Sequence, residues 1–189
     1  MKEIIKMIVV LSAISAVCGF GLAAINALTK ERIIEQKLLN VVGPTVNKVL
    51  AGSSNDLIKE RKEIIINKKK YVVFIGMKNG TPWGLAYEEV GSGFGGEMSV
   101  LIGFDLANDT LTGIGITSHR ETPGVGSRAT EDSFTERFKG RQLNEVFKIK
   151  ADGGVIDAVT GATVTSKGVC SAVEKGVPLY KDIKKQVIK

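Results

Sequence analysis

Residues 71–89 read YVVFIGMKNGTPWGLAYEE, two apolar and β-branched runs separated by Asn79-Gly80. An Asn-Gly pair between such runs is a strong hairpin signal, because both residues accept the positive φ of a tight turn. The stretch therefore predicts two antiparallel strands, over about 71–75 and 83–89.

The same pattern continues on the carboxyl side of this hairpin. Apolar runs over 98–105 and 111–117, separated by Asn108-Asp109, predict two further strands. Beyond them we expect a short helix near 132–138, a short strand over 156–159 and a helix over about 165–187. Meandering strands followed by helices predict an α+β domain, with an antiparallel sheet and flanking helices.

The amino-terminal segment predicts a membrane anchor. Met7 to Thr29 is a run of 23 residues without a charge, and a helix of that length spans about 34 Å, enough for a hydrocarbon core of roughly 30 Å. A cleaved signal peptide is the alternative, because Lys2 and Lys6 precede the run, but no small-x-small site ends it. A lipoprotein signal ending at Cys18 is disfavoured, since the residue before it is valine.

The predicted organisation has three parts, an anchor over 1–29, a helical connector over 30–60 and a folded domain over 61–189. The helical pattern continues past the anchor to about residue 41. Gly43-Pro44 is expected to interrupt it, before a short helix over 45–50 and a loop over 51–56.

Composition excludes several classes of function. The 189 residues carry 26 basic and 20 acidic side chains, and 43% are hydrophobic, which excludes a disordered chain. One histidine and two cysteines exclude histidine-rich metal sites, zinc ribbons, multi-cysteine iron–sulfur clusters and a disulfide framework. The basic runs over 68–70 and 181–189 lack interleaved aromatic residues, which argues against a nucleic-acid partner. Cys170, beside Val169 and Val173, is expected in the core.

Two familiar motifs are matched only superficially. The stretch from Gly91 to Gly96 satisfies GxGxxG but leads into an apolar run typical of a strand, whereas a dinucleotide fold needs a helix there. Its glycines instead predict a loop with close backbone approach or positive φ. Gly161 to Lys167 lacks the glycine that a phosphate loop has before its lysine. His119 is the single histidine and no GxSxG elbow accompanies it, so a hydrolase is a weak alternative.

Two segments carry most of the functional information. Asp157 to Ser166 runs through a glycine turn to a helix start with four hydroxyl groups. Such a start suits a phosphate, because its N–H groups are unpaired, but the same residues also serve as plain N-caps. His119 to Arg128 joins polar groups, a proline and two glycines after a strand, and is either a shaped binding loop or a surface connection.

Together these segments resemble the FMN-binding subunits of membrane redox complexes. Asp157-x-x-Thr160-Gly161-Ala162-Thr163 is similar to that family's flavinylation motif, and His119 to Gly126 is similar to its H-x-E-T-P-G-x-G loop. Gly93 to Gly96 and Ile102 to Asp105 are similar to its glycine-rich loop and following strand. Chain length favours the G subunit of the Rnf electron-transport complex over the longer C subunit of the sodium-pumping NADH:quinone reductase.

The resemblance implies that 61–189 is an FMN-binding domain and that Thr163 carries FMN through a phosphoester, with Thr165 as the rival attachment residue. Asp157 and Gly161 would belong to the signal read by a separate flavin transferase that uses FAD, because an unactivated threonine hydroxyl is a poor nucleophile. In the loop, His119 and Thr122 would be donors and Glu121 a structural or hydrogen-bonding partner. The implied cofactor-binding set is Thr160, Gly161, Ala162, Thr163, Thr165, Ser166, His119, Glu121, Thr122, Pro123 and Gly124.

The function implied by the resemblance is that of an electron-carrying subunit of a membrane-bound, ion-translocating ferredoxin:NAD oxidoreductase. Its partners would be other membrane and peripheral subunits, the flavin transferase and membrane lipid. The chain would cross the cytoplasmic membrane once, with the N-terminus cytoplasmic and the domain extracytoplasmic, although the flanking charges do not decide this orientation. The alternatives are a role like that of the C subunit of the quinone reductase and a binding or assembly module that never acquires flavin.

Overall fold

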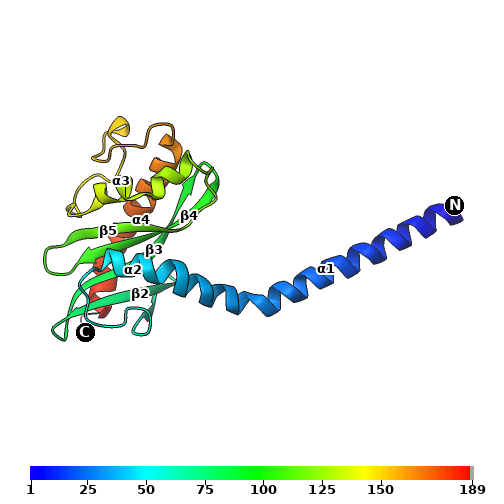
Figure 1. Ribbon diagram of the computed structural model, residues 1–189, viewed down its shortest axis with the longest axis horizontal. Helices are drawn as coiled ribbons and strands as arrows, with labels where there is room; N and C mark the ends of the chain where they lie inside the picture. Colours follow the sequence, from blue (N-terminus) through cyan, green and yellow to red (C-terminus); the bar gives the residue numbers. More distant parts are fainter. Residues whose placement is uncertain (188–189) are drawn as a thin grey trace. The chain divides into compact units, whose positions relative to one another are not determined.

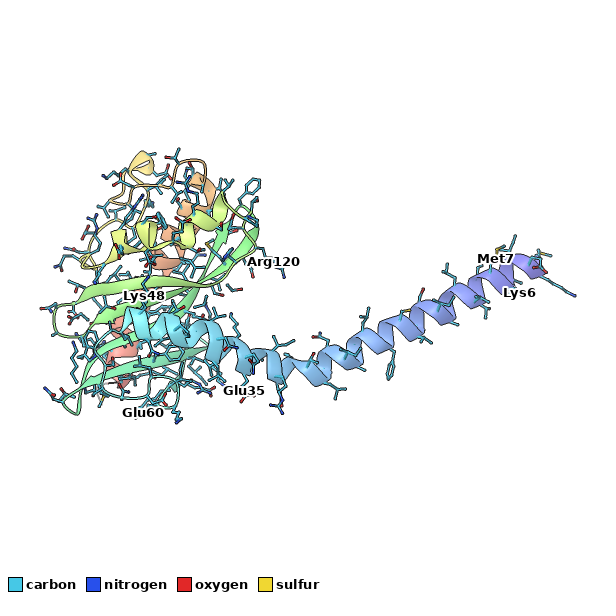
Figure 2. All side chains as sticks on the ribbon, viewed as in Figure 1. Lys6, Met7, Glu35, Lys48, Glu60 and Arg120 are labelled. Carbon is cyan, nitrogen blue, oxygen red and sulfur yellow. The ribbon has the colours of Figure 1, made fainter. Side chains whose placement is uncertain are left out.

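The computed structural model describes residues 1–187, and the chain divides into two compact units between Asn40 and Val41. The first unit contains helix α1 (Lys2–Lys37), in which no residue is buried. Side chains such as Lys6 and Met7 project outward around it (Figure 2). Among the described residues, this helix begins the one helical stretch long and apolar enough to cross a membrane. Its length and composition agree with the predicted anchor.

The helical backbone does not break at Gly43-Pro44, so the predicted interruption is wrong. A π-helical turn, η1 (Leu38–Val42), follows α1, and α2 (Gly43–Val49) follows directly. Pro44 lies in the first turn of α2, directly after the π-helical turn, so the missing N–H of proline falls where the regular α-helical hydrogen-bond pattern is already altered.

The second unit is built on one antiparallel sheet of five strands in sequential order, β1-β2-β3-β4-β5 (Figure 1). This confirms the α+β class and the four predicted strands. The strands are β1 (Lys62–Ile66), β2 (Lys69–Lys78), β3 (Thr81–Gly93), β4 (Gly96–Asp105) and β5 (Thr110–Ser118).

Strand β1 was not predicted from the sequence. It pairs with β2 through a tight turn at Asn67 and Lys68, whose φ angles are 50° and 65°. This turn resembles the predicted turn at Asn79 and Gly80, with φ of 50° and 77°. The second residue of this turn is lysine instead of glycine, so the sequence does not signal a hairpin here. A residue with a β-carbon rarely adopts positive φ.

Helices α2 and α4 (Thr163–Val187) cover opposite faces of the sheet. On β4, a β-carbon at Gly103 would lie 2.2 Å from Val49 of α2, whereas the side chain of neighbouring Ile102 reaches Gly176 of α4. Successive residues of a strand point to opposite faces, so the two helices lie on different sides. Figure 1 shows α2 in front of the sheet and α4 behind it.

The α4 side holds the larger core. Tyr87 stacks on Phe104 and Phe104 on Tyr180, with ring centroids 5.1 Å and 4.8 Å apart. The buried Tyr87 hydroxyl donates to the Gly176 carbonyl at 2.8 Å, and burial raises its pKa. Cys170 is also buried here, as the sequence predicts.

Short helical turns connect the sheet to α4. The predicted helix near 132–138 is present as α3 (Asp132–Thr135) followed by a 3₁₀ turn, η3 (Glu136–Phe138). Two further 3₁₀ turns are η2 (Gly126–Thr130) and η4 (Lys150–Asp152).

The predicted strand over 156–159 is wrong. This segment makes only an isolated bridge, between Ile149 and Ile156. Within the segment, the carbonyl groups of Asp157 and Ala158 accept hydrogen bonds from the Arg137 guanidinium instead of from a neighbouring strand. A backbone satisfied in this way needs no β-ladder.

Candidate cofactor site at the start of α4

The turn before α4 is closed by Ser166. Its Oγ accepts from the Val159 N–H and donates to the Ala162 carbonyl, both at 3.0 Å. The Ala162 N–H in turn donates to the Val159 carbonyl, and Gly161 has φ of 80°, which favours glycine. Ser166 is fully buried, so this hydroxyl holds the turn.

Helix α4 begins at Thr163, two residues before the predicted start. The first hydrogen bond within the helix runs from the Ser166 N–H to the Ala162 carbonyl. The amides of residues 163–165 precede it, so they belong to the free N–H groups of a helix start. The side chains of Thr160 and Thr163 are exposed. Thr163 therefore combines a free hydroxyl with the positive end of the helix dipole.

Thr165 differs from Thr163 although only one residue separates them. Its side chain is 1% exposed and its hydroxyl donates to Glu121 Oε2 at 2.9 Å. The other carboxylate oxygen, Oε1, accepts from the Gly95 N–H at 3.2 Å. Glu121 therefore links three segments, the β3–β4 hairpin, the loop after β5 and the first turn of α4.

Glycines make room for Glu121 and for the hairpin. A β-carbon at Gly93 would lie 2.1 Å from Glu121 Oε1, and one at Gly126 would lie 2.4 Å from Oε2. A β-carbon at Gly91 would lie 2.0 Å from the Gly168 carbonyl of α4. The predicted close backbone approach is therefore present, although Gly91 and Gly93 lie in β3 and the turn itself is Phe94-Gly95.

The loop over 119–126 surrounds Glu121. The Glu121 N–H donates to His119 Nδ1 at 3.2 Å, and Gly124, with φ of 76°, donates its N–H to Ser127 Oγ at 2.9 Å. His119, Thr122 and Pro123 are exposed, whereas Glu121 is buried. Glu121 is therefore held by hydrogen bonds within the protein, and His119 Nδ1 accepts from the Glu121 N–H. Arg120 projects outward beside the hairpin (Figure 2).

Asp157 lies on the surface next to basic groups. Its carboxylate pairs with Lys150 Nζ at 2.8 Å, and this hydrogen bond holds the pKa of Asp157 below its ordinary value. Arg137 binds the backbone at residues 157 and 158, and Arg141 donates to the Val155 carbonyl at 3.4 Å. Sequence reasoning missed both arginines, because no local pattern links them to carbonyl groups 14 to 21 residues later.

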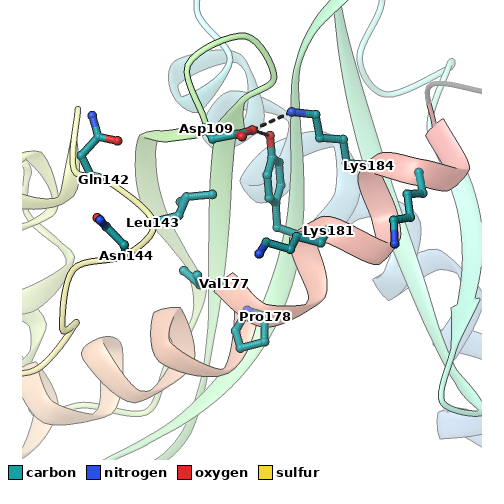
Figure 3. A pocket seen from close by; sticks show the side chains of 10 residues that line it. Asp109, Gln142, Leu143, Asn144, Val177, Pro178, Lys181 and Lys184 are labelled. Atoms are coloured by element: carbon teal, nitrogen blue, oxygen red, sulfur yellow. Dashed lines mark hydrogen bonds and ion pairs between the residues drawn. The ribbon is translucent and has the colours of Figure 1, made fainter.

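A separate groove lies at the other half of α4. This groove, of about 910 Å³, runs between Val177 to Lys185 of α4 and the segment 142–144, with the Asp109–Lys184 ion pair at its edge (Figure 3). Thr163 and Val177 are separated by about 21 Å along a helix axis, at 1.5 Å per residue. The groove is therefore separate from the α4 start. Among residues 1–187, no cluster of side chains could hold a metal ion.

Comparison with known proteins identifies the family to which the chain is similar. Residues 93–177 match the FMN-binding domain family. The chain is 33% identical to the G subunit of the ion-translocating oxidoreductase complex of Vibrio vulnificus, over 93% of this chain and 89% of that protein. It is 32% identical to the G subunit of the Na⁺-translocating ferredoxin:NAD⁺ oxidoreductase complex of Acetobacterium woodii, over 97% of this chain and 95% of that protein.

A solved structure shares the fold. The crystal structure of the C subunit of the Na⁺-translocating NADH-quinone reductase from Parabacteroides distasonis matches with a TM-score of 0.54 and 25% identity. The match covers 69% of this chain and 68% of that one. With its N-terminal apolar helix, the chain is a single-pass membrane protein. Because it is more than 30% identical to such subunits over most of both chains, the protein belongs to the family of G subunits of ion-translocating oxidoreductase complexes.

Proposed function

We propose that this chain is an electron-carrying subunit of an ion-translocating ferredoxin:NAD oxidoreductase complex, and that it carries FMN as a phosphoester on Thr163. Family membership supports the redox role, and the match of residues 93–177 to the FMN-binding domain family supports the cofactor. When bound, FMN supplies one- and two-electron transfer, while the protein supplies its position and electrostatic environment.

The observation that carries the attachment site is the difference between the four hydroxyl groups of the motif. Thr165 and Ser166 are buried and their hydroxyl groups are already hydrogen-bonded. Thr160 is exposed but lies within the turn, outside the helix. Thr163 alone is exposed and lies in the first helical turn, whose free amides and positive dipole stabilise a phosphate.

Attachment would use FAD and a separate flavin transferase. The Thr163 Oγ–phosphorus bond forms, the pyrophosphate P–O–P bond of FAD breaks, AMP leaves, and the hydroxyl proton passes to a base of the transferase. A separate enzyme is proposed because a threonine hydroxyl is a poor nucleophile unless a base activates it. The exposed Asp157 and the turn at Gly161 would form part of the surface that this enzyme recognises.

The family also supports a proposal for the remaining partners and the orientation. The chain would relay electrons between an iron–sulfur centre of membrane subunits and a second covalent flavin, with α1 in contact with lipid and other subunits. Its N-terminus would be cytoplasmic and its domain extracytoplasmic, in the cytoplasmic membrane. Covalent attachment suits that location, because a dissociated FMN could not readily be replaced there.

Intact mass of the full chain, co-expressed with a flavin transferase, tests the attachment residue. We expect one FMN on the natural chain and on Thr165→Val, which removes the rival hydroxyl, and none on Thr163→Val. Circular dichroism on each variant shows that it is folded. A full FMN mass on Thr163→Val excludes the assignment, and peptide mapping then locates the true residue. An unmodified natural chain that supports electron transfer in its complex would favour the non-flavinylated module.

A further inference from the structure

We propose that the groove along the carboxyl-terminal half of α4 is a docking site for an acidic segment of another subunit, in which an apolar side chain is flanked by carboxylates. The relatives of this chain are subunits of oxidoreductase complexes, so its surface is expected to contact other subunits. The inference does not depend on the attachment of FMN, because the groove lies at the opposite half of α4 from Thr163.

Two segments supply the apolar side chains of the groove. Leu143 lies in the segment after η3, and Val177 and Pro178 lie on α4 (Figure 3). Leu143 and Val177 are half-buried against the core on the α4 side of the sheet, and Pro178 is exposed. The groove has a volume of about 910 Å³, within the range of sites that bury most of a ligand's surface. An apolar side chain placed there would exchange water for contact with both segments.

The charged side chains of the groove are mainly basic. Lys181, Lys184 and Lys185 line it, and Asp109 is its one acidic lining residue in the described part of the chain. The Asp109 carboxylate is already bound by Lys184 Nζ at 2.6 Å and by the Tyr180 hydroxyl. Lys181 and Lys185 are exposed, and neither forms an ion pair with another residue of the range 1–187. The groove therefore presents two positive charges for an occupant to neutralise.

The two exposed lysines define a spacing for the acidic groups of the occupant. Lys181 and Lys185 are four residues apart on α4, which separates their α-carbons by about 6 Å along the helix axis and keeps both on one face. Carboxylates one turn apart on a bound helix, or two residues apart on a bound strand, have nearly the same spacing. Paired charges of this kind fix the register of the occupant and steer its approach. An acidic segment with an apolar residue between its carboxylates therefore matches the groove in charge and in polarity.

Other occupants match the groove less well. An inorganic anion would bind the lysines but leave Leu143 and Val177 in contact with water. A membrane surface is bound by apolar side chains that enter the lipid, whereas these two are half-buried and line a groove. A second copy of this chain is the remaining alternative, and cross-linking separates it from another subunit.

Site-specific cross-linking in the assembled complex tests the proposal. The full chain carries p-benzoylphenylalanine in place of Asn144, an exposed residue of the groove, and the complex is purified in detergent through a tag on a different subunit. After irradiation, mass spectrometry identifies the cross-linked peptide. We expect a segment of another subunit that has an apolar residue between two carboxylates. A cross-link only to lipid, only to a second copy of this chain, to a segment without carboxylates or to no protein overturns the proposal.

Charge reversal measures the contribution of the two lysines. Lys181→Glu combined with Lys185→Glu should lower the amount of this chain that co-purifies with the tagged subunit at least fivefold. Replacement of the two carboxylates of the cross-linked segment by lysine should restore it. Lys62→Glu combined with Lys68→Glu makes the same charge change on exposed lysines outside the groove, and is the control. Co-purification of the groove variant equal to that of the control overturns the proposal.

Two measurements separate this result from a loss of the fold or of the flavin. Circular dichroism shows whether the groove variant is folded. If it is not, Lys181→Gln combined with Lys185→Gln replaces it, and should lower co-purification at least twofold. Intact mass should show the same FMN content as in the natural chain. An unmodified natural chain overturns the proposed attachment and leaves the docking proposal standing, whereas unchanged co-purification with full FMN mass does the reverse.

Discussion

At the scale of single residues, Glu121 determines how the site is built. A buried carboxylate is costly unless hydrogen bonds satisfy it, and Glu121 obtains them from Thr165 and Gly95. Both partners lie far from it in sequence, so one side chain fixes three separate segments. The burial of Thr165 is a consequence of the same contact.

Replacing Glu121 tests this description. Glu121→Ala should lower the free energy of unfolding by about 2–4 kcal/mol, because it leaves the buried Thr165 hydroxyl without an acceptor and opens a cavity. Glu121→Gln keeps the size of the side chain and one acceptor oxygen, so it should lower the free energy of unfolding by less than Glu121→Ala. Glu97→Ala, at an exposed acid of β4, is the control. Urea unfolding followed by Trp83 fluorescence measures the difference, and equal stabilities of the two alanine variants would contradict the role given to Glu121.

The residues of the site show what sequence reasoning reaches and what it misses. The helix start and the hydroxyl cluster over 160–166 are local features, so the sequence predicts them. It cannot separate Thr163 from Thr165, because their difference depends on a hydrogen bond to Glu121, 44 residues away. The two arginines that bind the 155–158 backbone escape prediction for the same reason.

At the scale of elements, the sequence predicts hairpins that have a clear turn signal. It does not predict irregular segments whose backbone groups are hydrogen-bonded by distant side chains. The Asn79-Gly80 turn identifies the β2–β3 hairpin, since its residues adopt the φ that the turn requires. The apolar run over 156–159 resembles a strand, but its carbonyl groups are bound by Arg137. Strand β1 is not predicted, because the turn that joins it to β2 contains lysine where a hairpin signal would have glycine.

The carboxyl-terminal half of α4 is joined to the β4–β5 turn by an acid-sensitive contact. Asp109 accepts from Lys184 at 2.6 Å and from Tyr180, and these hydrogen bonds, led by that of Lys184, lower the pKa of Asp109 in the folded state. A lowered pKa stabilises the fold above the ordinary aspartate pKa of about 3.9, and this contribution disappears as the pH falls through the folded value.

Asp109→Asn should therefore be less stable than the natural chain at pH 7, and the difference should shrink as the pH falls below the ordinary aspartate pKa. The effect should be modest, because the Asp109 side chain is 59% exposed and solvent screens the pair. Thermal unfolding across this pH range measures it. Asp182→Asn, at an exposed acid on the same helix, is the control. A stability difference that does not shrink on acidification would contradict the assignment to Asp109.

At the scale of the whole molecule, the two units have separate structural requirements. No residue of α1 is buried, whereas the unit from Val41 onward contains both cores of the sheet. The stability of the second unit therefore comes from its own contacts. The sequence predicts the apolar helix and the antiparallel sheet, because an uncharged 23-residue run and the apolar strand pattern can each be recognised alone.

A chain that begins at Val41 should fold without the anchor. We expect it to be soluble without detergent and to unfold cooperatively on heating. Its near-ultraviolet circular dichroism should match the full chain, because the stacked Tyr87, Phe104 and Tyr180 rings all lie in this unit. A fragment that aggregates or lacks this aromatic signal would show that the anchor contributes to folding.

The burial of Cys170 has a practical consequence for spectroscopy. Burial, together with the nearby negative charge of Glu174, raises the pKa of this thiol to about 12, so at neutral pH it stays protonated and reacts slowly with maleimides. Cys18 is the one other cysteine of the chain and lies in the anchor. A cysteine engineered into the surface of the anchor-free fragment would thus accept a spin label or fluorophore at a single position, with the native Cys170 left in place.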